Sequence, residues 1–309
     1  MAPLSPAAQV PPVPVAHPAS HPRGDRPYRS ALRAYGFVLP FALVYAVFFG
    51  WPVARLFHLS FTATRMGEPA GMFVGLAQYQ RLVHDPLFWR TLGHTLYFVV
   101  LTVPALVALG LGLALLALRA GRLRPFAQAA FFLPYILPVS VVALIWGWLL
   151  NPTFGIVNQL LGTRTPWLGD ATLAMPSIAV ATIWWTVGFN VLLFMAGLQN
   201  IPAEVKEAAR LDGATSGQVF RHITWPMLQP VTTLVLVLQV INSLKIFAQV
   251  YLMTRGGPEH VTRVSLQYMY DQGFTNLDTG YASAIGVAIF LLIIAVALLQ
   301  ARLLPERQA

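Results

Sequence analysis

Polar side chains occur inside two of the most apolar stretches of the chain, where lipid offers no hydrogen-bond partner. They are amides, hydroxyls, aromatic rings and one amine: Trp185, Thr186, Phe189 and Asn190 in one stretch, and Gln239, Asn242, Ser243 and Lys245 in the other. One helical face, an arc of about 120° at 100° per residue, collects Gln239, Asn242, Lys245 and Gln249. Flat aromatic rings cover the C–H groups of a sugar, and amides bind its hydroxyls. The pattern predicts a path for a hydroxylated small molecule.

Two alternatives stay open for these residues. Ser, Thr, Asn and Gln commonly form hydrogen bonds that hold membrane helices together, so any one of them can be structural. Lys245 can extend its amine to the outer membrane surface, or it can balance the charge of an anionic substrate such as a phosphorylated polyol.

A second polar segment, residues 202–226, joins the two apolar stretches and is rich in charged side chains. Pro202 suits a first helical turn, and Gly213 suits the end of a helix. Glu204 and Glu207 complement the positive end of the helix dipole. One narrow face of this helix carries Val205, Ala208, Ala209 and Asp212.

After Gly213, a short apolar seam of Val219, Phe220 and Ile223 leads to Trp225-Pro226. The segment is therefore predicted to form two short helices that meet at a glycine and fit the cleft of another protein. The alternative is a solvated loop that is merely helical, because charged runs usually face water.

The elements that position these residues are membrane-spanning helices. The 309-residue chain is 57% hydrophobic and 10% charged, with a mean hydropathy of +0.64, which is typical of a polytopic membrane protein. Six runs are long enough to cross the hydrocarbon core: 35–56, 93–118, 131–150, 173–198, 228–248 and 282–303. The runs are continuously apolar, so they predict an all-α protein with six transmembrane helices and not a barrel of alternating strands.

Lys and Arg residues are more frequent in the loops on the side of the N-terminus, which predicts that both termini are cytoplasmic. Residues 1–34 are rich in Pro, Ala and His and are expected to be a disordered cytoplasmic tail. The expected permease domain is 35–303, and 304–309 form a second tail. Basic residues are scattered over the loops, so the net charge of +9 does not indicate nucleic-acid binding.

The sequence offers no catalytic or metal-binding pattern. It contains neither GxxxxGK[ST] nor HExxH, and it has no cysteine. We therefore expect no catalytic residue, no metal site and no cofactor bound by this chain. A stand-alone carrier coupled to ions or protons generally has acidic residues or histidines within its spans; here every Asp and Glu maps to a loop or tail.

The sequence resembles the permease subunits of ABC importers. The spacing of Glu207-Ala208-Ala209, Gly213, Ile223 and Pro226 is similar to the EAA loop of that family, although Trp225 stands where the family usually has Leu. Similar pieces follow the same order along 39–302: "FFLPYILP", "NPTFGIVNQLL", "GFNVLLFMAGLQNIP", "EAARLDGA", "MTRGGP" and "GYASAIGVAIF". These resemble the carbohydrate-uptake branch, in particular its first permease subunit of the maltose or glycerol-3-phosphate type.

The resemblance implies a subunit of the cytoplasmic (inner) membrane of a prokaryote that moves a sugar, such as a di- or oligosaccharide, by alternating access. A phosphorylated polyol is the alternative cargo. A stand-alone secondary transporter is a weaker alternative for the function. Implied partners are a second homologous permease, a dimer of ATP-binding subunits that uses ATP and Mg, and an extracytoplasmic substrate-binding protein. The implied ATPase-coupling residues are Glu207, Ala208, Ala209, Asp212, Gly213, Ile223 and Pro226.

Overall fold

The computed structural model describes residues 38–68 and 71–303. The two predicted tails, 1–34 and 304–309, lie outside these residues. The described chain is mostly helical, which confirms the all-α prediction. Its one sheet is a two-stranded antiparallel pair, β1 (Thr62–Ala63) and β2 (Met72–Phe73).

Five helices of the described chain are long and apolar enough to cross a membrane, and a strongly bent pair makes a sixth candidate. The five are Val38–Ser60, which includes η1 (Ala46–Gly50) and α2 (Trp51–Ser60); α4 (Pro86–Arg119); α8 (Ala174–Gln199); Ser216–Leu244; and α14 (Thr279–Leu303). They correspond to five of the six predicted runs. Residues 38–53 of the first helix are apolar on every side and all exposed, as expected of a segment in lipid. The described residues divide into two units, with the boundary between Val53 and Ala54.

The predicted span 131–150 is not one continuous helix. The structure divides it between α5 (Arg124–Ile136), preceded by η2 (Gly121–Leu123), and α6 (Val139–Leu149), and the two axes are bent by 97°. Leu137 between them is extended, with φ −67° and ψ 139°. Pro138 is the cause, because a proline disfavours the helical conformation of the residue before it and has no N–H to continue the ladder.

The predicted span 228–248 is also different in extent. A single helix of 29 residues runs from Ser216 to Leu244 through α10 (Ser216–Val219), η3 (Phe220–Thr224) and α11 (Trp225–Leu244). The second short helix predicted in 202–226 is therefore continuous with the span and not separate. At the other end, the chain leaves the helix at Lys245 and begins α12 (Ala248–Met253).

The core lies where α4, α5, α8 and α11 cross. Val191 and Phe194 of α8 pack with Ala114 of α4 and with Leu228 and Val235 of α11, all of them buried. Glycines allow the close crossings, as small residues do between membrane helices. A methyl group at Gly188 of α8 would lie 1.9 Å from the Phe131 carbonyl oxygen of α5.

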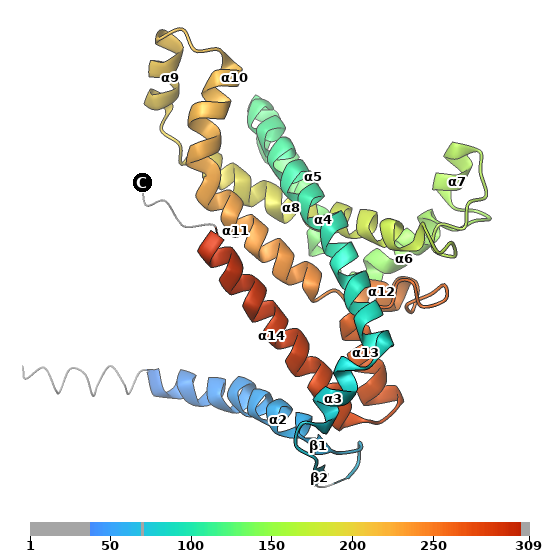
Figure 1. The fold of residues 1–309 in the computed structure, drawn as a ribbon. Coiled ribbons are helices and arrows are strands. Elements are labelled where there is room, and N and C mark those ends of the chain that lie inside the picture. The colour runs from blue at the N-terminus through green and yellow to red at the C-terminus, as the bar shows by residue number, and fades with distance from the viewer. Residues whose placement is uncertain (1–37, 69–70, 304–309) are drawn as a thin grey trace, which may run out of the picture. The chain divides into compact units, whose positions relative to one another are not determined.

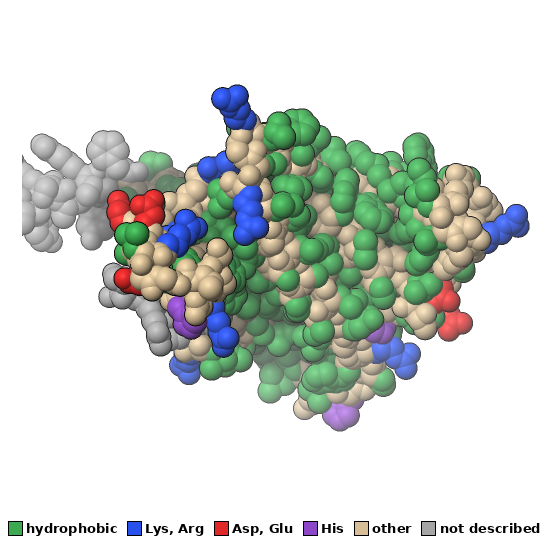
Figure 2. Space-filling model, turned by 90° about the horizontal axis from the view of Figure 1, so that it is seen from above, with side chains coloured by type: hydrophobic (Ala, Val, Ile, Leu, Met, Phe, Trp, Pro, Cys, Tyr) green, Lys and Arg blue, Asp and Glu red, His purple; other side chains and the backbone are tan. Residues whose placement is uncertain are grey.

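The loops at the end of α14 opposite to its C-terminus carry short elements: α3 (Ala77–Val83), α13 (Ser265–Tyr270) and η4 (Asp271–Thr275) (Figure 1). Between α6 and α8 lies α7 (Ile156–Leu161). The helix α9 (Ala203–Leu211) lies at the far end of α11, away from α3 and the β strands (Figure 1). Hydrophobic side chains cover most of the face seen from above in Figure 2, and charged side chains are few there.

Candidate functional site

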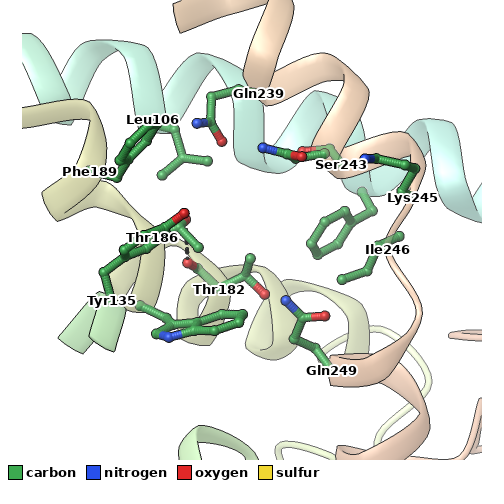
Figure 3. Close-up of a pocket in the computed structure, with 13 residues that line it drawn as sticks. Leu106, Tyr135, Thr182, Thr186, Phe189, Gln239, Ser243, Lys245, Ile246 and Gln249 are labelled. Carbon is green, nitrogen blue, oxygen red and sulfur yellow. Dashed lines mark hydrogen bonds between the residues drawn. The ribbon is translucent and has the colours of Figure 1, made fainter. Parts of the chain in front are cut away.

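A cavity of about 350 Å³ lies among α4, α5, α8, α11 and α12 (Figure 3). Seven of the predicted path residues line it: Trp185, Thr186, Phe189, Gln239, Asn242, Ser243 and Lys245. Gln249 of the predicted arc lines it too, and the structure adds Tyr135 and Thr182, together with the apolar Phe98, Leu106 and Ile246. The volume is at the lower end of the range for small-molecule pockets.

Asn190, the eighth predicted residue, does not line the cavity. It is fully buried behind Gln239, whose Nε2 donates a hydrogen bond of 2.7 Å to Asn190 Oδ1. The Gln239 amide is thereby anchored on α8, and its oxygen is turned toward the cavity (Figure 3). Asn190 supports the lining residue instead of contacting a ligand.

Two aromatic side chains form a flat wall. The rings of Tyr135 and Phe189 are stacked, with centroids 5.3 Å apart and planes 18° apart. Trp185 stands beside them and donates its indole N–H to the Leu137 carbonyl at 3.1 Å. That carbonyl belongs to the extended residue that follows α5, and groups at a helix end need a partner from outside the helix. The break before Pro138 thus positions the Trp185 ring.

Hydroxyl groups line the α8 side of the cavity. Thr182 and Thr186 donate their protons to the carbonyls of Ile178 and Thr182, each at 2.8 Å. Their oxygen lone pairs remain able to accept hydrogen bonds. On the α11 side, the Ser243 hydroxyl is buried and shares a 3.0 Å hydrogen bond with the Thr102 hydroxyl of α4.

Lys245 and Gln249 lie where the chain passes from α11 to α12. Although the predicted arc assumed one continuous helix, both side chains line the cavity. The Lys245 amine is turned toward Ser243, and the Gln249 amide toward Thr182 (Figure 3). In the part of the chain that the structure describes, no Asp or Glu lines this cavity.

The predicted coupling segment lies at the end of the bundle marked by α9 in Figure 1. The helix α9 ends at Leu211, and Gly213 then adopts a φ of +85°, which glycine tolerates best. Ala209, Asp212, Gly213 and Ile223 line one hollow of about 420 Å³. Glu207, Ala208 and Pro226 are exposed, and Leu211 is 90% exposed. Four of the seven predicted coupling residues thus lie together at one hollow. The hollow and the exposed residues of α9 are hereafter called the α9 surface.

A polar cluster at the opposite end was not found from the sequence. Asp85 caps α4 by accepting from the backbone N–H of Leu87, and its second oxygen accepts hydrogen bonds of 2.5 Å from Tyr268 and Tyr281. Burial alone would raise the pKa of Asp85, but the hydrogen bonds outweigh it and lower the pKa. Burial and the bond to Asp85 raise the pKa of Tyr268 to about 12.

Arg81 extends this cluster. Its guanidinium lies 3.8 Å from the centre of the Tyr281 ring and forms a 2.7 Å salt bridge with Asp278. The Thr64 carbonyl accepts from the backbone N–H of Gly280 and from the Thr279 hydroxyl. These contacts tie the start of α14 to α3 and to Thr64 after β1, and the Tyr281–Asp85 bond ties it to the start of α4. Asp85-Pro86 was the available signal, since Asp at the cap and Pro at the first position mark a helix start.

Residues 67–308 match the family model described as binding-protein-dependent transport system inner membrane component. The chain belongs to this family. The permease is 34% identical to the sulfoquinovosyl glycerol transport system permease protein of Agrobacterium fabrum, over 92% of each chain. It is 33% identical to the trehalose/maltose transport system permease protein of Thermococcus litoralis, over 86% of this chain and 92% of the relative.

The permease also has the fold of a solved membrane protein. It matches a chain of a bacterial ABC transporter involved in alginate import with a TM-score of 0.80, over 91% of this chain and 98% of that chain. The sequence identity is 22%. This confirms the predicted fold class.

Proposed function

We propose that the permease is the transmembrane subunit of an ATP-driven importer that moves a sugar, such as a di- or oligosaccharide, by alternating access. The observation that carries this proposal is the cavity. It places a stacked aromatic pair, Tyr135 and Phe189, beside amide and hydroxyl groups, and this combination suits a molecule with C–H faces and hydroxyl edges. The relatives named for sulfoquinovosyl glycerol and for trehalose/maltose support a sugar as cargo.

Different walls of the cavity would contact different parts of the sugar. The rings of Tyr135, Trp185 and Phe189 cover the apolar face of a sugar ring. Gln239, held by Asn190, presents its amide to a hydroxyl, and Asn242 is exposed and free to do the same. Lining residues come from five different helices, so a rigid-body tilt of the bundle would open and dismantle the site, as alternating access requires.

The energy for this tilt comes from partner subunits. The sequence has no phosphate-binding loop of its own, and we assign ATP and Mg to a dimer of ATP-binding subunits. The α9 surface would receive that dimer, with the carboxylate of Glu207 at a charged contact. A second homologous permease and an extracytoplasmic substrate-binding protein complete the proposed assembly.

The proposed membrane is the cytoplasmic (inner) membrane of a prokaryote, with both termini cytoplasmic. The α9 surface then faces the cytoplasm, where ATP is available. A reporter fused after Pro226 should be cytoplasmic, and one fused after Pro258 extracytoplasmic. The reverse pattern would overturn this orientation.

A phosphorylated polyol is the second candidate cargo, favoured by the position of Lys245 on the cavity. A stand-alone secondary transporter is disfavoured, because no acidic side chain of the described residues lines the cavity and ion coupling generally needs one.

The experiment that tests the function is purification of the permease with its co-purifying subunits in proteoliposomes. We expect ATP hydrolysis that a sugar, presented by its binding protein, stimulates. A permease that purifies alone and moves solute down an ion gradient without ATP would overturn the proposal.

A further inference from the structure

We propose that the cavity selects a saccharide that carries an anionic group, a carboxylate, sulfonate or phosphate, and that Lys245 binds this group. The inference rests on the proposed function and narrows its substrate class. It starts from the balance of charge in the cavity, which has the Lys245 amine on its lining and no lining carboxylate among residues 38–68 and 71–303.

Lys245 has no ionic partner among the described residues. The described residues contain two salt bridges, Arg81–Asp278 and Arg263–Asp271, and neither involves it. A lysine with an unbalanced charge on a cavity attracts an anion, and the exposed side chain of Lys245 leaves its amine accessible to one.

The end of α11 offsets only part of this charge. Lys245 is the residue that follows the last helical turn, and a helix C-terminus carries about half a negative elementary charge. The amine therefore keeps a net positive charge for a ligand. Since the partial charge belongs to the backbone, it is present whichever side chain stands at 245.

Other lining groups can donate hydrogen bonds to an anion in the cavity. Asn242 and Gln249 also line the cavity, and each offers an amide N–H₂. The Gln249 amide and the Lys245 amine approach the cavity from the same side, the passage between α11 and α12 (Figure 3). An anionic oxygen beside Lys245 would thus have further donors, while the sugar ring reaches the Tyr135–Phe189 wall.

The test uses a single reporter thiol, because the chain has no cysteine. Thr186→Cys places a thiol on the cavity, and its alkylation by a small maleimide is followed in full-length permease in phosphatidylcholine nanodiscs. The probes are glucose and glucuronate, which differ by one carboxylate. With Lys245 present, we expect glucuronate to protect the thiol at a concentration about 10- to 100-fold lower than glucose, the range for a charged hydrogen bond.

Variants at 245 assign the effect. In the same background, Lys245→Gln should abolish the difference between the two sugars, and Lys245→Arg should keep it. The control Arg164→Gln removes a positive charge from an exposed loop residue and should leave the difference unchanged. If Lys245 had only a structural role, Lys245→Gln would reduce the protection by glucose and by glucuronate to the same extent.

Other outcomes overturn the proposal. Equal protection by glucose and glucuronate, or a preference that survives Lys245→Gln, rejects the anionic group and leaves the sugar pathway standing. Protection by neither sugar rejects the pathway as well. Protection by anionic lipid alone, seen when phosphatidylglycerol replaces phosphatidylcholine, would assign Lys245 to a lipid headgroup instead of a substrate.

Discussion

Asn190 holds Gln239 in the position from which its amide reaches the cavity, through a buried hydrogen bond of 2.7 Å between α8 and α11. One residue is on the cavity and the other is not. Asn190 therefore has a structural role in this contact, and Gln239 is the partner that can contact a transported molecule.

The first prediction concerns this pair. Asn190→Leu leaves the Gln239 amide buried without its acceptor, which should destabilise the protein by about 1–3 kcal/mol. It should also slow uptake, since Gln239 loses its orientation. Thermal unfolding in detergent and sugar uptake in cells measure the two effects.

The double variant Asn190→Leu with Gln239→Leu is the control. Replacing both partners by apolar groups should restore part of the stability but not the uptake. Restored uptake in the double variant would show that the pair serves only to hold the helices together.

A second prediction concerns the crossing of α5 and α8. Gly188→Ala would place a methyl group against the Phe131 carbonyl, which is backbone and cannot move aside. We expect a loss of about 1–3 kcal/mol or more from overpacking, measured by the unfolding temperature. Gly147→Ala in α6 is the matched control, because nothing lies within 4 Å of its added methyl; equal effects of the two changes would contradict the packing assignment.

Much of the cavity could be predicted from the sequence because an amide or amine in an apolar run is conspicuous. Gln239, Asn242 and Lys245 were found in this way. Tyr135 was missed, since an aromatic residue in a membrane span does not stand out. Asn190 was misplaced, because polarity shows that a residue needs a partner but does not say whether that partner is a ligand or another helix.

The fold, too, could be predicted only in part from the sequence. Hydrophobic runs located the spans, but they could not distinguish a kink from the 97° bend at Pro138. The cluster around Asp85 was also out of reach, since Tyr268 and Tyr281 are 183 and 196 residues away along the chain. Contacts over that distance depend on how the helices pack and leave no local pattern.

The third prediction concerns Asp85. Asp85→Ala removes the cap of α4 and the acceptor of two tyrosine hydroxyls, and should destabilise the protein by at least about 1–2 kcal/mol. Asp85→Asn is the matched control. Its amide oxygen can still cap the helix, so a smaller loss in unfolding temperature is expected, and an effect as large as that of Ala would argue against the cap.

The same cluster sets a dependence of stability on pH. The pKa of Asp85 is lowered from 3.8 in the folded protein, so its contribution is present above pH 3.8 and is lost as the pH falls through the lowered value. The pKa of Tyr268 is raised from 10.0 to about 12, so its contribution is lost as the pH rises from 10 toward 12. We would measure the unfolding temperature as the pH falls below 3.8 and as it rises from 10 toward 12. In both ranges it should fall less in Asp85→Ala than in the unmodified protein.

The fourth prediction concerns the α9 surface. Gly213 has a φ of +85°, which proline cannot adopt. Gly213→Pro should leave the protein in the membrane but uncouple ATP hydrolysis from uptake. Glu207→Ala, which removes an exposed carboxylate, should have the same effect.

Gly217→Ala is the control for this surface, because its φ is not positive and nothing lies within 4 Å of the added methyl. It should transport normally. Full uptake by Gly213→Pro, with normal assembly of the ATP-binding subunits, would exclude the α9 surface as the coupling element.

The most direct test of the cavity as the transport path is substrate protection at Asn242. Asn242→Cys puts the only thiol of the chain on the cavity. The reference is a thiol at Asp170, a half-buried position before α8 that does not line the cavity. In the assembled transporter, the sugar that stimulates ATP hydrolysis should slow maleimide labelling at 242 and leave labelling at 170 unchanged. A labelling rate at 242 that this sugar does not alter would contradict the account, because the transported molecule would then pass elsewhere.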